Sequence, residues 1–268
     1  MTDRRPAGLD LTDRVAIVTG AGRGIGASTA VTLARAGADV VVTARTAGDV
    51  AAVAEQVRAD GRRAVEVPGD VNDLDLLAEL VDRAVSELGR LDIVVNNAGG
   101  SVSRPLLDTR VDQLERSFHF NVSVPFELSR LAVPHLLQAD GNAAIVNVSS
   151  VAGLNVSRGS LTHSLTKAAL NQLTRLMAVE LAPRIRVNAV LPGAIETDAL
   201  RTWLSSRGSA ARDVMISHTA MRRNGTPDDI AQAILFLASP AASWISGKLL
   251  EVDGLVFHEL IPSAIPDL

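Results

Sequence analysis

The sequence of 268 residues contains no cysteine, no tyrosine and very few other aromatic residues. Without cysteine the chain has no disulfide, no thiolate nucleophile and no cysteine-ligated zinc, and its five histidines do not have the spacing of metal ligands. No apolar stretch is long enough to cross a bilayer, and residues 1–14 are too polar for a signal peptide. We therefore expect no metal, no membrane span and a cytoplasmic location.

An excess of charge of either sign is also lacking. The net charge is −4 and the isoelectric point is near 5.7, which argues against a general nucleic-acid or anionic-membrane partner. Apolar residues make up 47% and charged residues 21%, a balance typical of a folded globular chain. The length suits one α/β domain with an ample core, and no Pro- or Ser-rich linker divides it. We predict a single domain over residues 1–268.

The most informative stretch is an apolar run followed by closely spaced glycines. Residues 15–18 predict a strand buried on both faces, and an Ala-rich helical pattern begins at residue 27. Glycines between strand and helix let the backbone approach a pyrophosphate, which the free N–H groups of the helix start then face. The spacing Thr19-Gly-x-x-x-Gly-x-Gly26 differs from Gly-x-Gly-x-x-Gly, although residues 22–27 fit its looser form. The alternative is a merely flexible loop; the order of strand, turn and helix favours a phosphate site.

The rest of the chain alternates between strand-like and helix-like segments. The predicted strands are 14–19, 38–43, 63–68, 91–95, 143–149, 184–191 and 247–252. The predicted helices are 24–36, 47–60, 73–88, 109–138, 160–182 and 226–238. Such alternation is typical of βαβ units with right-handed crossovers. We predict an α/β fold, a Rossmann-like, doubly wound parallel sheet of about seven strands with helices on both faces, and a ligand at the carboxyl ends of the strands.

The end of the second predicted strand bears on which dinucleotide binds. An acidic residue there would accept hydrogen bonds from the adenine ribose and repel a 2′-phosphate, but this position is Ala44. Arg45 follows it, and Arg23 lies in the glycine turn; a guanidinium fork suits a phosphate group. The two arginines favour NADP(H) over NAD(H), unless both are ordinary solvated surface charges.

Other predicted strand ends carry small or polar side chains. Asp70 follows the third strand, where it could accept a hydrogen bond from the adenine amine. Residues 97–99 follow the fourth, where small residues leave room for a cofactor and an amide ties loops together. Ser150 follows the fifth, and the turn 192–197, which could close over the cofactor, follows the sixth. Asn121, among apolar neighbours in a predicted helix, is either a structural knot or part of a proton path.

In this order the motifs resemble the short-chain dehydrogenase/reductase family of the single-domain kind, over about residues 10–254. The resemblance rests on Thr19-Gly-x-x-x-Gly-x-Gly26, Asp70, Asn96-Asn97-Ala98-Gly99, Asn121, Ser150, Lys167, Arg186-Val187-Asn188, Pro192-Gly193, Gly225-Thr226-Pro227-Asp228-Asp229-Ile230 and Glu251-Val252-Asp253-Gly254. The family's proton donor is a tyrosine four residues before the lysine, and here that position is His163, 13 residues after Ser150 as in the family. A register with Ser164 in the tyrosine's place is the alternative, but 163 and 167 share one helical face.

The resemblance implies hydride transfer between a nicotinamide cofactor and a carbonyl or alcohol. Lys167 would then hold the nicotinamide ribose, Ser150 would hydrogen-bond the substrate oxygen, and Asn121 would keep a water-linked proton path. We expect the cofactor to lie against Thr19, Gly20, Arg23, Gly24, Ile25, Gly26, Arg45, Asp70, Val71, Asn97, Ala98, Gly99, Lys167, Pro192, Gly193, Ile195 and Thr197. The family also implies a homo-oligomer, which we expect to be a tetramer.

A histidine at position 163 changes the expected acid–base chemistry. A neighbouring cation lowers the pKa of a tyrosine, about 10, toward neutrality, but it lowers the pKa of a histidine, about 6.5, away from it. Beside Lys167, His163 should be neutral at pH 7: a hydrogen-bond donor but a poor proton donor, and short enough in reach to need a bridging water. Three hypotheses stay open: a slower or acid-shifted reductase; a non-redox isomerase, lyase or cyclase; and a catalytically silent nucleotide-binding protein or partner subunit.

Two segments concern the substrate and the assembly. Residues 195–222 suit a lid over a hydrophobic small molecule, unless they pack on the core, because they include the largely apolar set Leu200, Trp203, Leu204, Met215, His218 and Met221. The tail 255–268 is also largely apolar, with Phe257, Leu260 and Ile261 as its bulkiest members. It either covers a neighbouring subunit or is a frayed terminus.

Overall fold

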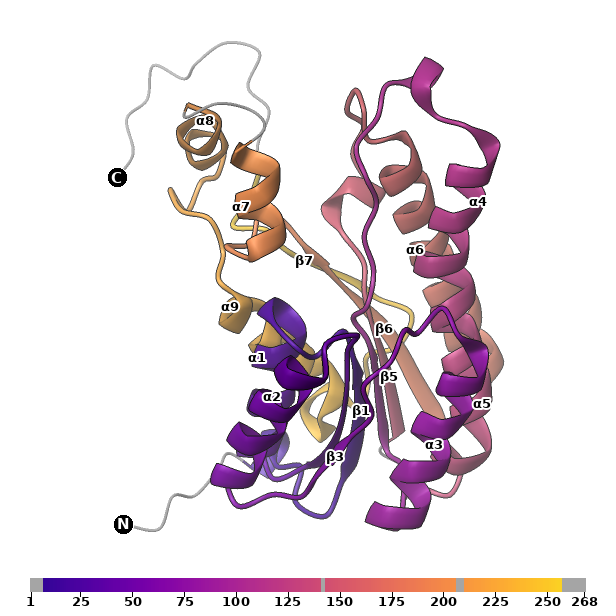
Figure 1. Ribbon diagram of the computed structural model, residues 1–268. Coiled ribbons are helices and arrows are strands. Elements are labelled where there is room, and N and C mark those ends of the chain that lie inside the picture. The colour runs from indigo at the N-terminus through magenta and orange to yellow at the C-terminus, as the bar shows by residue number, and fades with distance from the viewer. Residues whose placement is uncertain (1–6, 141–142, 206–209, 257–268) are drawn as a thin grey trace.

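The fold is a sheet of seven parallel strands between two layers of helices (Figure 1). The computed structural model describes residues 7–140, 143–205 and 210–256. The strands are β1 (Val15–Thr19), β2 (Asp39–Thr43), β3 (Ala64–Glu66), β4 (Ile93–Asn96), β5 (Ala143–Val148), β6 (Ile185–Pro192) and β7 (Leu249–Val252). Their order in the sheet is β3-β2-β1-β4-β5-β6-β7. The predicted doubly wound α/β fold is confirmed.

The strands form where the sequence is continuously apolar, because both faces of the sheet are covered. Every residue of β1, β2, β4, β5 and β6 is buried. One face packs against α1 (Gly24–Arg35), α2 (Ala47–Ala59) and α9 (Pro227–Ala238). The other packs against α3 (Leu74–Leu88), α5 (Val124–Leu136) and α6 (Leu161–Leu181). The chain thus has two apolar cores, one on each side of the sheet.

The topology determines where a ligand can enter. Strand β1 pairs with β2 on one side and with β4 on the other, so the strand order reverses between β1 and β4. At such a reversal the connections after the two strands lead to opposite faces, which leaves a crevice at the carboxyl ends. The loops that follow β1 and β4 therefore border the same opening.

The predicted helix 109–138 is wrong as one continuous element. The structure has α4 (Val111–Phe118), a π-helical turn (His119–Ser123) and then α5. Pro125 lies in the first turn of α5, where its missing N–H cannot continue the hydrogen-bond pattern of the preceding turn. Predicted strand 63–68 shortens to β3, and predicted strand 247–252 begins at Leu249; the remaining boundaries agree to within about two residues.

The predicted lid segment contains two helices that the sequence pattern did not indicate, α7 (Asp198–Ser205) and α8 (Ala211–Ser217). Both lie beyond the carboxyl ends of the strands (Figure 1). Most of the predicted tail, with Phe257, Leu260 and Ile261, lies outside the described residues. Within the described ranges no helix is long and apolar enough to cross a membrane.

Candidate active site

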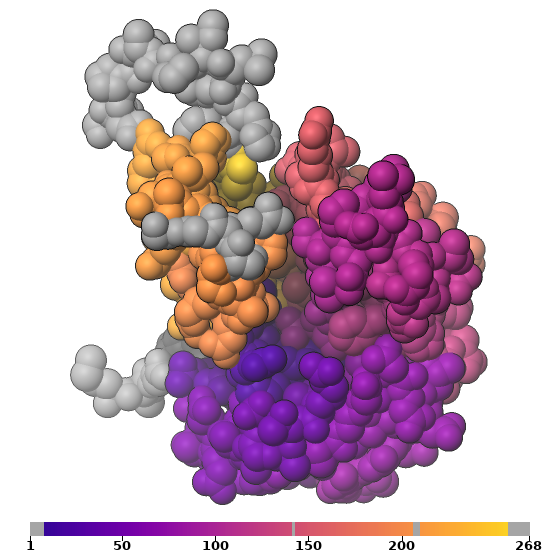
Figure 2. Space-filling view, turned by 45° about the horizontal axis from the view of Figure 1, so that its top comes forward, coloured from indigo at the N-terminus to yellow at the C-terminus, as the bar shows by residue number. Residues whose placement is uncertain are grey.

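The carboxyl ends of the strands open into a cavity of about 1280 Å³. Figure 2 shows a hollow between the orange α7–α8 segment and the magenta α4 segment. Most of the predicted site residues line the cavity, namely Gly20, Arg23, Gly24, Ile25, Gly26, Arg45, Asp70, Val71, Asn97, Ala98, Gly99, Ser150, His163, Lys167, Pro192, Gly193, Ile195 and Thr197. Thr19 and Asn121 do not line it; they lie behind it.

The glycine turn after β1 is shaped for a close backbone approach. A Cβ on Gly26 would lie 2.3 Å from the carbonyl oxygen of Gly20, so no other residue fits without a backbone shift. Gly20 and Gly24 have φ values of +63° and +55°, a region that favours glycine. Arg23 precedes α1 and makes no side-chain cap to it, so the first N–H groups of the helix are free to face an anion. The turn therefore fits the pyrophosphate of a dinucleotide.

Thr19 braces the turn from behind rather than facing the cavity. Its hydroxyl accepts hydrogen bonds from the backbone N–H groups of Asn97 and Ala98, both at 3.0 Å. In return the amide of Asn97 donates to the carbonyl oxygens of Thr19 (2.8 Å) and Gly20 (3.2 Å). Because these bonds join the ends of β1 and β4, they fix the two loops that border the cavity. The expected direct contact of Thr19 with the cofactor is not supported by this placement.

The end of the cavity that lies away from Ser150 has charged side chains of both signs. The exposed side chains of Arg23 and Arg45 line it, beside Ala44 at the end of β2. Asp49, which the sequence reasoning missed, also lines it from the first turn of α2, so close that a Cβ on Gly22 would lie 2.9 Å from its Cβ. The carboxylate of Asp70 accepts hydrogen bonds from the Asn72 backbone and side chain and so fixes that turn.

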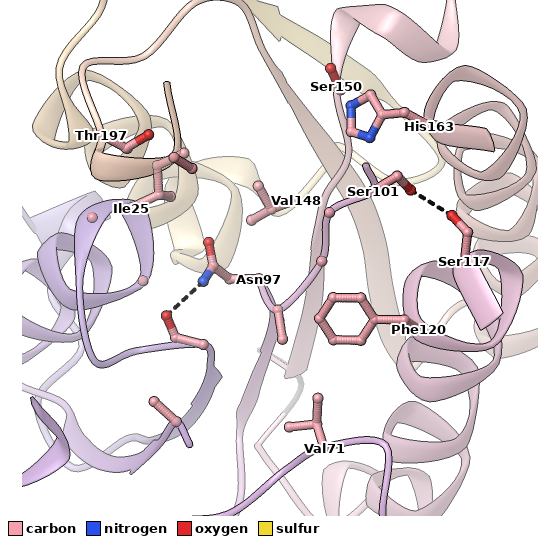
Figure 3. Close-up of a pocket in the computed structure, with 18 of the residues that line it drawn as sticks. Ile25, Val71, Asn97, Ser101, Ser117, Phe120, Val148, Ser150, His163 and Thr197 are labelled. Atoms are coloured by element: carbon pink, nitrogen blue, oxygen red, sulfur yellow. Dashed lines mark hydrogen bonds between the residues drawn. The ribbon is translucent and has the colours of Figure 1, made fainter. Parts of the chain in front are cut away.

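Ser150 and His163 lie side by side at the other end (Figure 3), and Lys167 lines the same cavity, as the sequence predicts. The hydroxyl oxygen of Ser150 accepts a hydrogen bond from the N–H of Ala152 at 3.1 Å, which leaves its own proton to donate. The ammonium of Lys167 is buried and donates to the carbonyl oxygen of Val148 at 2.9 Å. His163 precedes Lys167 by one helical turn on α6, and its Nδ1 is buried without a hydrogen-bond partner among the described residues.

Burial lowers the pKa of both basic groups at this centre. Burial and, to a lesser degree, the charge of Lys167 lower the pKa of His163 to about 4. Burial alone lowers the pKa of Lys167 to about 8. At pH 7 the imidazole is therefore neutral, while most of the lysine is protonated. A neutral imidazole donates from one nitrogen and accepts at the other, and because Nδ1 is shielded from solvent, Nε2 is the ring nitrogen that a ligand in the cavity can reach.

Asn121 lies in the π-helical turn, buried, and holds the loop after β4. Its amide donates to the carbonyl oxygens of Gly100 (2.8 Å) and Ser117 (2.9 Å), and its side-chain oxygen accepts from the N–H of Gly100 (2.9 Å). A Cβ on Gly99 would lie 3.0 Å from both Asn121 Oδ1 and Lys167 Nζ. The side chain therefore acts as the structural knot of the two alternatives, beside the lysine; its role in a proton path stays a prediction.

The substrate side contains residues that the sequence reasoning missed. Ser101 and Ser117 hydrogen-bond to each other across the cavity wall near His163 (Figure 3). Arg104 lines the wall farther along the same loop. The sequence did offer one signal for this wall, a spacing of four and then three residues that places side chains on one helical face. It is formed by Gln113 and Ser117 of α4 and by Phe120 of the π-helical turn, all of which line the cavity. Of the predicted lid side chains Leu200 borders the cavity, whereas Trp203, Leu204, Met215, His218 and Met221 lie outside its lining.

Comparisons with known proteins agree with this arrangement. A family model described as enoyl-(acyl carrier protein) reductase matches residues 20–254. The 7α-hydroxysteroid dehydrogenase of Escherichia coli is 40% identical over 94% of this chain and 97% of its own. A solved 7α-hydroxysteroid dehydrogenase in complex with NADH and 7-oxo glycochenodeoxycholic acid superposes with a TM-score of 0.90, covering 96% of this chain and 100% of that chain. The chain belongs to the short-chain dehydrogenase/reductase family.

Two further relatives place this family member among oxidoreductases. An uncharacterised oxidoreductase of Mycobacterium tuberculosis is 45% identical over 96% of this chain and 97% of its own. The cis-4-hydroxycyclohexanecarboxylate dehydrogenase of Sinomonas cyclohexanicum is 41% identical over 90% of this chain and 96% of its own. At family level the chain is an oxidoreductase of hydroxyl or carbonyl groups.

Proposed function

We propose that the protein is an NADP(H)-dependent oxidoreductase that interconverts a carbonyl and an alcohol on a predominantly apolar small molecule. The observation that carries the proposal is continuity: one cavity joins the glycine turn to Ser150, His163 and Lys167. A bound nicotinamide would supply or accept the hydride. The names of the relatives, a hydroxysteroid and a hydroxycyclohexanecarboxylate dehydrogenase, favour an alicyclic ketone or secondary alcohol as substrate.

The protein's own groups would act on the substrate oxygen. The Ser150 hydroxyl, capped by the Ala152 N–H, has its proton free to donate to that oxygen. His163 would hold it from the other side through a ring N–H and pass on a proton, directly or through a water. The buried ammonium of Lys167 adds positive charge that stabilises an alkoxide at the same place. Because the pKa of His163 is about 4, very little of the imidazole is protonated at pH 7. Proton delivery to the substrate oxygen is therefore the slow step of this mechanism.

Cofactor preference would follow from the charges at the far end of the cavity. Arg23 and Arg45 favour a 2′-phosphate, and no acidic side chain follows β2 directly. Asp49 opposes them from α2, so the preference is a balance of these charges. We expect NADPH to bind more tightly than NADH, and Arg45→Asp to reverse or abolish the difference. Fluorescence titration with both cofactors measures it, and equal affinities in the wild type would contradict the arginine argument.

The same geometry supports a second candidate, a non-redox reaction on this scaffold. A neutral imidazole beside a buried ammonium suits polarisation of a carbonyl, as in an isomerisation. Turnover of NADPH with a panel of alicyclic ketones decides between the two. Oxidation of NADPH with formation of the alcohol supports the reductase; tight NADPH binding with no oxidation by any ketone favours the second candidate or a silent binding protein.

Two further proposals concern the surroundings of the site. We infer that residues 195–222 cover the substrate, because Ile195, Thr197 and Leu200 line the cavity. An ion pair between Arg212 and Glu196 (2.8 Å) ties α8 to the loop after β6, which holds this segment near the mouth. We also infer a homotetramer, supported by exposed apolar side chains on the outer faces of α5 and α6 and beside the edge strand β7.

A further inference from the structure

The loop after β4 brings an arginine to the substrate side of the cavity. The backbone N–H of Arg104 donates to the carbonyl oxygen of Gly159 at 2.9 Å, and the Ser103 hydroxyl donates to the same oxygen at 2.8 Å. Gly159 lies four residues before His163, at the entry to α6. Two hydrogen bonds thus hold the backbone of Arg104 against the segment that leads to the reaction centre, and its side chain lines the same cavity.

The charge of Arg104 is not compensated by its surroundings. Within the described ranges its guanidinium has no ion pair and no hydrogen bond. The other charged side chains on this side have partners: Arg116 pairs with Asp112 at 2.6 Å, and Asp198 pairs with Arg201.

Glu115, an exposed acidic side chain of α4, also borders the cavity. It precedes His119 by one helical turn, and the His119 ring reaches the carbonyl oxygen of Asn72, in the loop after β3. Within the described ranges no ion pair joins Glu115 to Arg104, and Ser117 of the same helix hydrogen-bonds to Ser101. Arg104 is exposed to solvent, so a negatively charged group of a bound substrate would replace part of its water shell.

We propose that Arg104 binds a carboxylate of the substrate, so that the substrate is an alicyclic keto or hydroxy acid rather than a neutral ketone. This inference rests on the proposed function for the position of the reacting oxygen, at Ser150 and His163. The planar guanidinium fork matches a carboxylate in a bidentate geometry. Val102 and Leu200 line the same cavity and offer an apolar surface to the ring of the substrate. Arg104 is thus a specificity-determining residue that acts on the end of the substrate away from the chemistry.

Binding without turnover tests the subsite separately from the reaction. The probes are 4-oxocyclohexanecarboxylate and its neutral methyl ester, titrated by calorimetry into protein saturated with NADP⁺, in which no hydride is available. The variants are Arg104→Gln, Arg104→Lys and, as a matched control, Arg158→Gln, which removes an exposed arginine of the neighbouring loop outside the cavity lining. The wild type and Arg158→Gln should bind the carboxylate about tenfold or more tightly than the ester, as a charge-assisted hydrogen bond predicts.

The two variants at position 104 should separate the effect of the positive charge from that of the planar guanidinium fork. Arg104→Gln should bind both probes equally while keeping its melting temperature and its affinity for NADP⁺, and Arg104→Lys should keep part of the preference. Equal or undetectable binding of both probes by the wild type, or a preference that survives Arg104→Gln, would overturn the subsite. A preserved preference together with no oxidation of NADPH would reject the redox function and leave the carboxylate subsite standing.

Discussion

Among single residues, His163 has the largest chemical consequence. It lies one turn before Lys167 on α6, and we propose that it takes the position of the family's tyrosine proton donor. For a phenol, the nearby ammonium brings the pKa down toward neutrality; for this imidazole, burial and the ammonium take the pKa down to about 4, away from neutrality. The same environment thus activates one donor and silences the other. Ser150, Lys167 and the glycine turn line the same cavity as His163.

Restoring the phenol should therefore restore proton delivery. We expect His163→Tyr to raise kcat for ketone reduction at pH 7, by roughly 10²–10⁴-fold, the range that a positioned general acid supplies. His163→Ala should leave NADPH affinity nearly unchanged, because the pyrophosphate and ribose contacts lie at the other end of the cavity. Steady-state kinetics and a fluorescence titration provide the two readouts. Loss of the native activity in His163→Tyr, with NADPH still bound, would favour the non-redox candidate.

The partly buried imidazole should also make the fold sensitive to acid. The pKa of His163 is about 4 in the folded chain and near 6.5 in the unfolded chain, so between these values the unfolded state binds the additional proton. Stability is then lost as the pH falls from about 6.5 toward 4. From pH 7 to pH 4.5 the wild type should lose on the order of 2 kcal/mol more than His163→Gln in urea unfolding. Parallel losses in the two proteins would show that His163 is not buried in its neutral form.

At the scale of elements, the loops after β1 and β4 form one braced unit. Thr19 and Asn97 exchange hydrogen bonds across it, and Gly26 gives α1 the clearance to pack against the Gly20 backbone. The Asn121 amide holds the next part of the β4 loop from the π-helical turn. The loop after β4 lines the cavity both beside the glycine turn and near His163, so the hydrogen bonds to this loop stabilise both parts of the cavity.

A single methyl group in this unit should damage both folding and binding. Gly26→Ala places a Cβ 2.3 Å from the Gly20 carbonyl oxygen, which only a backbone shift can relieve. We expect a loss of about 1–3 kcal/mol in urea unfolding and at least about tenfold weaker NADPH binding. Gly48→Ala is the matched control: it lies in α2, has no atom within 4 Å of the new Cβ, and should be neutral or slightly stabilising. Unchanged NADPH affinity in Gly26→Ala would refute the proposed role of the turn.

The sequence predicts the parts of this fold that local chemistry determines. Continuous apolar runs located all seven strands, and the glycine spacing located the phosphate turn, because both depend on neighbours in the chain. The break between α4 and α5 was missed although Pro125 marks it, since apolar periodicity continues through the π-helical turn. Arg104 and Asp49 were missed for another reason: they reach the cavity only through tertiary packing, Arg104 against Gly159 and Asp49 against Gly22.

On the scale of the whole molecule, the exposed apolar side chains include two separate groups that we assign to subunit contacts. On α5 and α6 the exposed large apolar side chains are Phe126, Leu161, Leu165, Leu176 and Val179. Beside the edge strand β7, Trp244 is 99% exposed. A closed tetramer with three perpendicular twofold axes uses two distinct self-complementary interfaces, and each patch supplies the apolar centre that one of them needs.

Charge placed at each patch should dissociate the tetramer in steps. Multi-angle light scattering at micromolar concentration should give the wild type about four times the chain mass of 28.1 kDa. Val179→Glu and Trp244→Glu should each give a dimer, because each leaves the other interface intact, and the double variant should give a monomer. Leu107→Glu is the control: its side chain is 96% exposed, but it lies in neither patch. A wild-type mass of one chain would refute the assembly, whereas a dimer that only one of the two variants dissociates would assign the interface to that patch alone.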